Sequence, residues 1–458
     1  MSRGFFFDTA LLPDGWRHNV RIEAQDGIIN SVSTDATIDP GDSHLAIVVP
    51  GLPNVHSHAF QRAMAGLAER RGPRGADDFW TWREVMYRFV THLDADEIEA
   101  IAAYAYMDML EAGFTCVGEF HYLHRTPQGD LYTDPAELAL RHLAAADTTG
   151  IGLTLLPVFY AASNFGGALP TVGQRRFITD LDTFARIVER VRHDVLGSPG
   201  RNVGIAPHSL RAVTPNDLES LLRIYTHGPI HIHAAEQTKE VDDCVAWSKQ
   251  RPVEWLLDHA ALDARWCLVH ATHLTNVEMR RLVDSGSLAG LCPITEANLG
   301  DGIFPAAAYV AAGGRWGVGT DSNISIDAAG ELRQLEYAQR LNVQTRNALA
   351  SHDRPSTGRT LYEGALSGGA QALGLRVGAI AIGNRADLLV LDETHPDLLG
   401  RSDDSILDTW IFTGGRSLIR AVIAGGETVV EGSRHRDRDR IELAYRKVIS
   451  RVMQIDLA

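Results

Sequence analysis

The chain of 458 residues is poor in cysteine, short of basic residues relative to acidic ones, and free of long apolar runs. Its four cysteines lie far apart, and no C-x-x-C pair occurs among Cys116, Cys244, Cys267 and Cys292. This spacing argues against a disulfide framework and against a cysteine zinc site. We therefore expect reduced and mostly buried thiols.

Positive charge is also scarce, since 43 Lys and Arg face 58 Asp and Glu, for a net charge of −15. General binding to nucleic acid or to an anionic membrane needs a basic face, so neither is expected as a partner. No apolar stretch approaches the ~20 residues of a transmembrane helix, and Asp8 interrupts the apolar run at the N-terminus. These absences predict a cytoplasmic protein, while a few local arginines could still bind a small anion.

Both ends of the chain show short apolar runs broken by polar turns, as in 20–22, 27–29, 45–49, 386–391 and 419–426. Such runs are typical of antiparallel strands. They predict one small β-sandwich domain with its halves in residues 1–49 and 373–435. Residues 436–458 are charged and are predicted to form a C-terminal helix.

Between the two ends, short apolar strands alternate with longer amphipathic stretches, which predicts βα units and a parallel sheet. Eight such units fit an α/β fold of the (β/α)8 TIM-like barrel type over residues 50–372. The predicted strands are 48–52, 115–119, 152–156, 202–206, 229–233, 266–270, 288–292 and 315–319.

Polar residues gather where these strands end. His56 and His58 follow the first strand, His233 ends the fifth, and Asp321 follows the eighth. The carboxyl ends of barrel strands meet at one mouth, and alternation points residues 56 and 58 the same way. We expect these four side chains to hold one divalent metal ion, with zinc favoured and Fe(II), Mn or Co able to use the same ligands. His231 is an alternative to His233 as the third histidine.

Three residues near this predicted metal are candidates for catalysis. A bound divalent ion lowers the pKa of water, and Glu236, three residues past His233, could shuttle the protons. His270, at the end of the sixth strand, could assist the attacking water, and Asp321 could take the first proton. The alternative for Glu236 is a charge that stabilises a helix N-terminus.

These motifs resemble the amidohydrolase superfamily, in its mononuclear deaminase branch. The matching stretches are 50–58 (PGLPNVHSH), 233–236 (HAAE), His270 and 319–322 (GTDS). Dinuclear members carry a metal-bridging lysine on the fourth strand, whereas residues 202–208 (NVGIAPH) contain none. The resemblance therefore implies a single metal ion.

Three further stretches, 55–66, 79–83 and 206–211, resemble the formimidoylglutamate deiminase family. This resemblance implies hydrolysis of N-formimidoyl-L-glutamate to N-formyl-L-glutamate and ammonia in histidine degradation. It marks five substrate contacts, of which Arg83 is the weakest: Gln61, Arg83, Tyr122, His208 and Arg211. A guanidinium group such as that of Arg211 suits a dicarboxylate substrate, because it binds a carboxylate with two hydrogen bonds.

Other functions share the same metal ligands. A nucleobase deaminase acting on guanine or cytosine would need stacking groups rather than arginines, so Arg211 discriminates against it. A dechlorinating or amide-cleaving hydrolase would release no ammonia, and a non-catalytic barrel would be expected to lack Glu236 or a ligand. The aromatic residues around Phe79 are interpreted as the apolar face of a lid helix, and we expect a homodimer.

Overall fold

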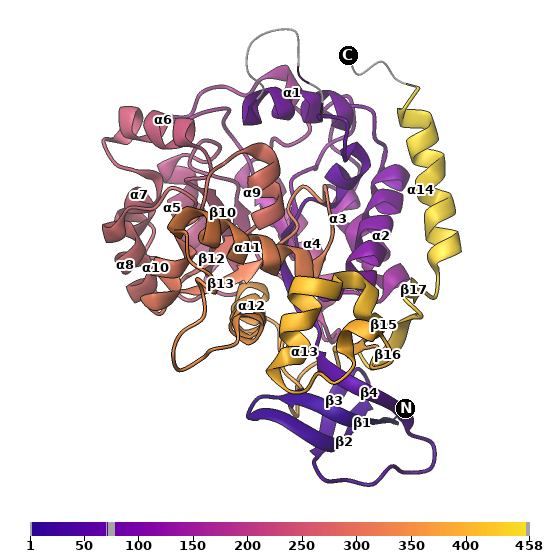
Figure 1. The fold of residues 1–458 in the computed structure, drawn as a ribbon. Coiled ribbons are helices and arrows are strands. Elements are labelled where there is room, and N and C mark those ends of the chain that lie inside the picture. The colour runs from indigo at the N-terminus through magenta and orange to yellow at the C-terminus, as the bar shows by residue number, and fades with distance from the viewer. Residues whose placement is uncertain (1, 70, 72–77, 455–458) are drawn as a thin grey trace.

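The computed structural model describes residues 2–69, 71 and 78–454, and parallel strands form a barrel at its centre (Figure 1). Strands β5 to β8 are hydrogen-bonded in sequence order, β9 pairs with β7, and β10 to β13 form a second run. The barrel strands are β5 (Leu52–Ser57), β6 (Phe114–His121), β7 (Gly152–Phe159), β8 (Arg201–Val203), β9 (Ala206–Pro207), β10 (Ile230–Ala234), β11 (Trp266–His270), β12 (Leu288–Leu291) and β13 (Arg315–Val318).

The two runs of strands close into a ring through isolated bridges. Ser57 pairs with Asp321 at one joint, while Ile205 pairs with Ile230 at the other. At the first joint the amide of Asp321 donates to the carbonyl of His56 at 2.9 Å. Closure of the barrel therefore places His56 and Ser57 beside Asp321, which follows β13.

Helices surround the barrel, and several begin where the sequence offers a capping side chain. Asp94 and Glu97 form a capping box for α2, and Thr275 and Glu278 form one for α8. The helices are α1 (Phe79–Val90), α2 (Ala95–Glu111), α3 (Glu137–Thr149), α4 (Leu181–Val195), α5 (Pro215–Ile224), α6 (Thr238–Ser248), α7 (Pro252–His259), α8 (Asn276–Ser285), α9 (Pro293–Leu299), α10 (Ala306–Ala311), α11 (Ala328–Val343), α12 (Thr357–Leu373), α13 (Asp404–Thr409) and α14 (Arg438–Val452).

The prediction of the first barrel strand at 48–52 is wrong. Residues up to Pro50 belong to the sheet built from the chain ends, and the barrel strand starts at Leu52, so His56 lies inside it. The chain changes sheets at Gly51, where a Cβ would meet the side chain of Thr115 at 2.2 Å. Apolar residues continue from β4 into β5, so the hydrophobic pattern did not show where one sheet ends and the barrel begins.

The predicted fourth strand, 202–206, is interrupted. It splits into β8 and β9 around Gly204, whose missing Cβ would lie 2.4 Å from the carbonyl oxygen of Pro229. Glycine is needed there because the backbone of the next unit approaches so closely. The other six predicted strands match observed strands to within a few residues.

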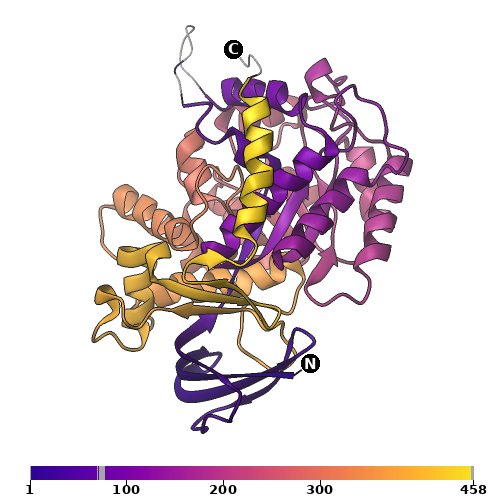
Figure 2. The ribbon, with the colours of Figure 1, turned by 90° about the vertical axis from the view of Figure 1, so that its right-hand side faces the viewer.

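The two chain ends form one continuous eight-stranded sheet below the barrel, in the order β17-β16-β15-β14-β4-β1-β2-β3 (Figures 1 and 2). Apolar residues from both ends share one cluster under this sheet, among them Phe7, Val20, Leu388 and Ile423. The prediction that both chain ends join in one β unit is confirmed, and its strands form a single hydrogen-bonded sheet where the sequence predicted a sandwich. Its strands are β1 (Ser2–Leu12), β2 (Gly15–Gln25), β3 (Ile28–Ser33), β4 (Ser43–Pro50), β14 (Leu388–Leu391), β15 (Ile419–Ala424), β16 (Glu427–Glu431) and β17 (Arg434–His435).

The C-terminal helix α14 runs along the outside of the barrel beside α2 (Figure 2). The ring of Tyr445 on α14 stacks on the ring of Tyr104 on α2, with centroids 3.9 Å apart. Among the residues that the structure describes, no helix is both long and apolar enough to cross a membrane.

Candidate active site

The four predicted metal ligands converge at the carboxyl end of the barrel. Nε2 of His56 lies 3.2 Å from Nε2 of His58, and Oδ1 of Asp321 lies 3.4 Å and 3.3 Å from these two nitrogens. His233 joins them, and one ligand atom from each of the four residues lies within 4.8 Å of the others. All four side chains are buried.

Hydrogen bonds to backbone carbonyls orient two of the imidazoles. Nδ1 of His58 donates to the carbonyl of Phe120 at 3.0 Å, and Nδ1 of His233 donates to that of His208 at 3.0 Å. With the proton on Nδ1, the Nε2 of each ring is left with a lone pair that can bind a cation within the group of four ligands. Buried electron-rich groups this close together repel one another, and a cation bound between them removes that repulsion.

The protonation states of the four side chains also favour a bound cation. Burial lowers the pKa of His56 to about 3 and lowers those of His58 and His233, so the imidazoles are neutral ligands. Burial alone would raise the pKa of Asp321, but its hydrogen bond to His56 and the charges nearby hold it below its usual range. The donor set fits a divalent cation that takes three imidazoles and a carboxylate.

His231 is not part of this group. Its Nε2 bonds to the carbonyl of Ala372 on α12 at 2.8 Å, which fixes the ring inside the barrel core. Of the two histidines that the sequence offers on this strand, only His233 reaches the other three ligands.

Glu236 lies beside this group, in contact with two other site residues. One carboxylate oxygen is 3.7 Å from Nε2 of His270 and the other is 4.0 Å from the guanidinium of Arg211. Burial raises the pKa of Glu236 to about 7, although His270 and Arg211 both lower it. A carboxyl group with this pKa can both accept and donate a proton near neutral pH.

His270 carries a proton in these surroundings. Burial lowers its pKa, but Glu236, Glu296 and Asp321 together raise it to about 10. Its Nδ1 is held by Oε1 of Glu296 on α9 at 3.2 Å, which leaves Nε2 directed at Glu236. The site therefore combines a glutamate that titrates near neutrality with an imidazolium.

A small cavity of about 50 Å³ connects the metal-binding group with the predicted substrate residues. It has room for a few water molecules, and α1 covers it. Its lining includes all five predicted substrate contacts, which are Gln61, Arg83, Tyr122, His208 and Arg211.

Hydrogen-bonding groups in this cavity are left without partners. Nε of Arg83 and of Arg211 and Oε1 of Gln61 are buried and have no hydrogen-bond partner within the described residues. The hydroxyl oxygen of Tyr122 accepts from Nε2 of Gln61 at 2.8 Å, so its own hydrogen remains available. The cavity thus offers two guanidinium groups and a phenol, which suit carboxylate groups. Burial lowers the pKa of His208, which leaves that ring neutral.

The ring of Trp80 on α1 lies against three cations. The guanidinium of Arg83 is 4.4 Å from its centroid, that of Arg211 is 5.6 Å away, and Nζ of Lys239 is 5.7 Å away. Cation–π attraction at this ring offsets part of the repulsion among the three positive charges. The sequence predicted the apolar face of a lid helix here, and the contacts of Trp80 with three cations were not part of that prediction.

Two carboxylates that support the site were missed in the sequence. Glu296 fixes His270, and Glu240 on α6 accepts hydrogen bonds from the backbone amides of Ala235 and Glu236. Glu296 follows the end of β12 by five residues. Polar residues just after barrel strands are candidates for the site, so this position could have been predicted. Glu240 lies within a helical pattern, and nothing in the sequence distinguishes it from a surface glutamate.

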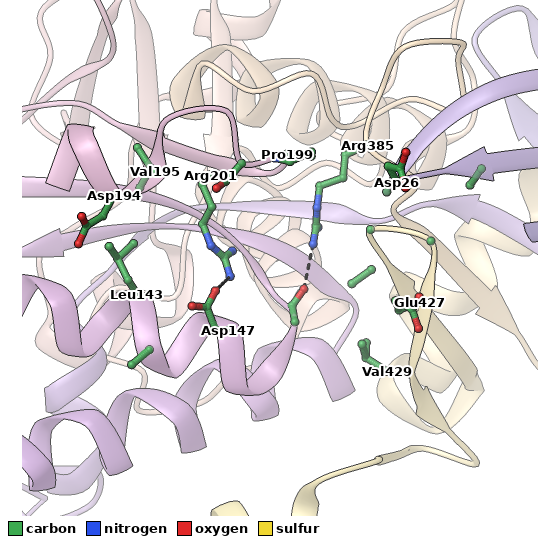
Figure 3. A pocket seen from close by; sticks show the side chains of 18 of the residues that line it. Asp26, Leu143, Asp147, Asp194, Val195, Pro199, Arg201, Arg385, Glu427 and Val429 are labelled. Carbon is green, nitrogen blue, oxygen red and sulfur yellow. Dashed lines mark hydrogen bonds and ion pairs between the residues drawn. The ribbon is translucent and has the colours of Figure 1, made fainter. Parts of the chain in front are cut away.

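A larger cleft of about 1090 Å³ lies at the opposite end of the barrel strands, between the barrel and the sheet of the chain ends (Figure 3). Its arginines are engaged with the protein, since Arg201 pairs with Asp147 at 2.8 Å and Arg385 donates to the carbonyl of Gly150 at 2.9 Å. The amino-terminal end of a barrel usually serves stability rather than catalysis. The chemistry is therefore assigned to the smaller cavity.

Comparisons with known proteins agree with this geometry. The model of the amidohydrolase family matches residues 47–429. A model described as the N-terminal domain of formimidoylglutamate deiminase HutF matches residues 5–45. A protein of Pseudomonas aeruginosa named formimidoylglutamate deiminase is 50% identical over 98% of this chain and 99% of its own length.

Solved structures share the whole fold. A crystal structure of an amidohydrolase from Brucella melitensis is 50% identical, with a TM-score of 0.94 over 98% of this chain and 100% of that chain. A structure described as an adenosine deaminase from Xanthomonas campestris with bound zinc has a TM-score of 0.82 at 21% identity, over 99% of this chain and 98% of that chain. The second likeness concerns the fold alone.

Proposed function

The chain belongs to the amidohydrolase family, and we propose that it is a formimidoylglutamate deiminase, which hydrolyses N-formimidoyl-L-glutamate to N-formyl-L-glutamate and ammonia. The observation that carries this proposal is 50% identity over 98% of the chain to the Pseudomonas aeruginosa protein of that name. The site supports it independently, because a metal-binding group, a titrating glutamate and two arginines share one cavity.

The metal ligands in this proposal are His56, His58, His233 and Asp321. When bound, a divalent ion lowers the pKa of a water molecule and polarises the group under attack. Zinc is the proposed ion, because three imidazoles and one carboxylate suit it, and Fe2+ is the alternative.

Glu236, His270 and Asp321 move and hold the protons. Water adds to the formimidoyl carbon, so a C–O bond forms while the C=N double bond to the terminal nitrogen becomes a single bond. The C–N bond then breaks as the formyl carbonyl forms. Both protons of water reach that nitrogen, one as the C–O bond forms and the other from the hydroxyl as the carbonyl forms. Glu236 delivers a proton to the departing nitrogen, which leaves as ammonia. The first proton from water goes to Asp321 or Glu236, while the imidazolium of His270 stabilises negative charge beside Glu236.

The two substrate carboxylates are assigned to the arginine side of the cavity. Arg211 and Arg83 each have an unpartnered buried Nε, and each guanidinium can bind a carboxylate through two hydrogen bonds. Tyr122, with Gln61 behind it, donates a further hydrogen bond. His208, whose ring is neutral, lines the same wall. A purine or pyrimidine ring would leave both guanidinium groups desolvated and unpaired, which costs binding energy.

An ammonia-release assay tests the proposal. Purified protein is given N-formimidoyl-L-glutamate, guanine or cytosine at equal concentrations, and ammonia and N-formyl-L-glutamate are measured. We expect turnover of N-formimidoyl-L-glutamate, with one ammonia for each N-formyl-L-glutamate. Faster release from guanine or cytosine would favour the nucleobase deaminase alternative, and no release from any substrate would refute both.

A further inference from the structure

The turn that carries Glu236 has an unusual backbone. Ala235 and Glu236 follow the end of β10, and α6 begins at Thr238. Ala235 has a φ of +53°, in the left-handed region that residues with a Cβ avoid. Such a conformation costs about 1–2 kcal/mol, so the surrounding contacts must hold it in place.

The side chain of Glu240 supplies such contacts. One of its carboxylate oxygens accepts from the amide of Ala235 at 3.3 Å, and the other accepts from the amide of Glu236 at 3.1 Å. A glutamate at this position of a helix usually reaches back to the amide of the N-cap residue. Here the N-cap is Gln237, whose side chain makes no cap, and Glu240 reaches the two residues before it.

Burial makes these two bonds more important. Glu240 is 1% exposed, so its carboxylate has exchanged water for the two amides. From the other side of the turn, the carbonyl of Ala235 accepts from the amide of His273, in the loop after β11, at 3.2 Å. The turn is therefore held through its amides by Glu240 and through a carbonyl by the neighbouring loop. The backbone conformation of this turn determines where the carboxylate of Glu236 lies.

We propose that Glu240 is a positioning residue for the deamination, because its clamp on the amides of Ala235 and Glu236 holds the Glu236 carboxylate beside His270. The inference rests on the proposed function, in which Glu236 transfers protons. Glu240 itself touches neither the substrate cavity nor the metal ligands, since it is absent from both groups of residues. Its charge also acts on Arg211 and raises the pKa of Glu236. Glu240→Gln keeps an oxygen that can accept from an amide but loses the charge, so it separates the effect of position from that of charge.

The variants Glu240→Ala and Glu240→Gln test this role by steady-state ammonia release from N-formimidoyl-L-glutamate. A displacement of about 1 Å in a reacting group can cost roughly 100-fold in rate. We expect Glu240→Ala to lower kcat by roughly 30-fold to 100-fold with little change in KM and in bound metal. Glu240→Gln keeps one oxygen that can accept from an amide, so it should recover part of the loss.

A double-mutant cycle separates positioning from a general structural effect. Residues that act as one unit are not additive in their effects on rate. In the Glu236→Gln background, Glu240→Ala should therefore lower the residual rate by less than about twofold. If Glu240→Ala lowers kcat by the same factor in both backgrounds, the proposal is overturned.

A matched control is available in Glu336 on α11, another buried carboxylate that holds two consecutive backbone amides. It is 0% exposed, and it accepts from the amides of Ala348 at 2.7 Å and Leu349 at 3.0 Å. It does not line the cavity. Glu336→Ala should lower Tm as Glu240→Ala does, while kcat remains that of the unaltered protein.

The outcomes also distinguish the inference from the proposed function. A normal kcat in Glu240→Ala, together with a large loss in Glu236→Gln, would overturn the inference and leave the proposed function intact. A normal kcat in Glu236→Gln would overturn both. If Glu240→Ala does not fold, the cycle is measured with Glu240→Gln, whose folding is followed by the same melting curve.

Discussion

Replacement of Arg211 by alanine tests how the site selects a dicarboxylate. Arg211 is 7% exposed and its Nε has no partner within the described residues, so the guanidinium is available to a ligand in the cavity. A hydrogen bond to a charged group contributes about 1.5–3 kcal/mol. Loss of a two-bond contact with a carboxylate should therefore weaken binding by roughly 3 kcal/mol or more, which is roughly 100-fold in KM.

The same substitution should shift the pH profile in a known direction. The positive charge of Arg211 lowers the pKa of Glu236, so its removal raises that pKa. A glutamate that must accept a proton is active above its pKa, and the acid limb of kcat/KM, which reports the free enzyme, should therefore move to higher pH. Arg211→Lys keeps the charge but loses the planar fork, so it should restore the pH profile and only part of the affinity.

The assay is ammonia release over a range of substrate concentrations and pH, with bound metal measured on each variant. Arg201→Ala is the matched control, because Arg201 pairs with Asp147 in the cleft at the other end of the barrel. It should leave KM unchanged. If KM and the pH profile of Arg211→Ala equal those of the unaltered protein, the assignment of a carboxylate to Arg211 is refuted.

Three further predictions concern the same cavity. Glu236→Gln should lower kcat at least ~100-fold while bound metal is unchanged, and a near-normal kcat would remove Glu236 from the mechanism. In the unaltered protein, kcat/KM should fall as the pH drops below about 7, because burial raises the pKa of Glu236 to about 7 and its protonated form accepts no proton; a flat profile of kcat/KM from pH 8 to pH 5 would contradict this. Tyr122→Phe should raise KM roughly fivefold, for one hydrogen bond of about 1 kcal/mol, and an unchanged KM would mean that the hydroxyl does not touch the substrate.

The metal-binding group could be predicted because its residues lie within one short motif or at the ends of predicted barrel strands. The alternation of His56 and His58 and the convergence of strand ends were enough to bring His233 and Asp321 to the same point. The chain's change of sheets at Gly51 was not predictable, since the apolar residues on both sides are equally buried. Patterns of hydrophobicity record burial, and they do not record which sheet a strand joins.

The supporting carboxylates escaped prediction for a different reason. Glu240 acts through two backbone amides, and Glu296 acts through Nδ1 of His270. Such contacts depend on the geometry of the turns, which the sequence pattern does not give. The three cations around Trp80 likewise come from α1, α6 and the segment after β9, which only the folded barrel brings together. The expected homodimer and cytoplasmic location remain predictions.

The most direct test of the central claim is a metal titration of the apoprotein. The protein is stripped with a chelator, dialysed, and supplied with zinc in steps while ammonia release from N-formimidoyl-L-glutamate is measured. The rate should rise linearly and level off at one ion per chain, and His233→Ala should gain no activity over the same range. Full activity in the stripped protein, or a plateau only at two ions per chain, would contradict a single ion held by three histidines and Asp321.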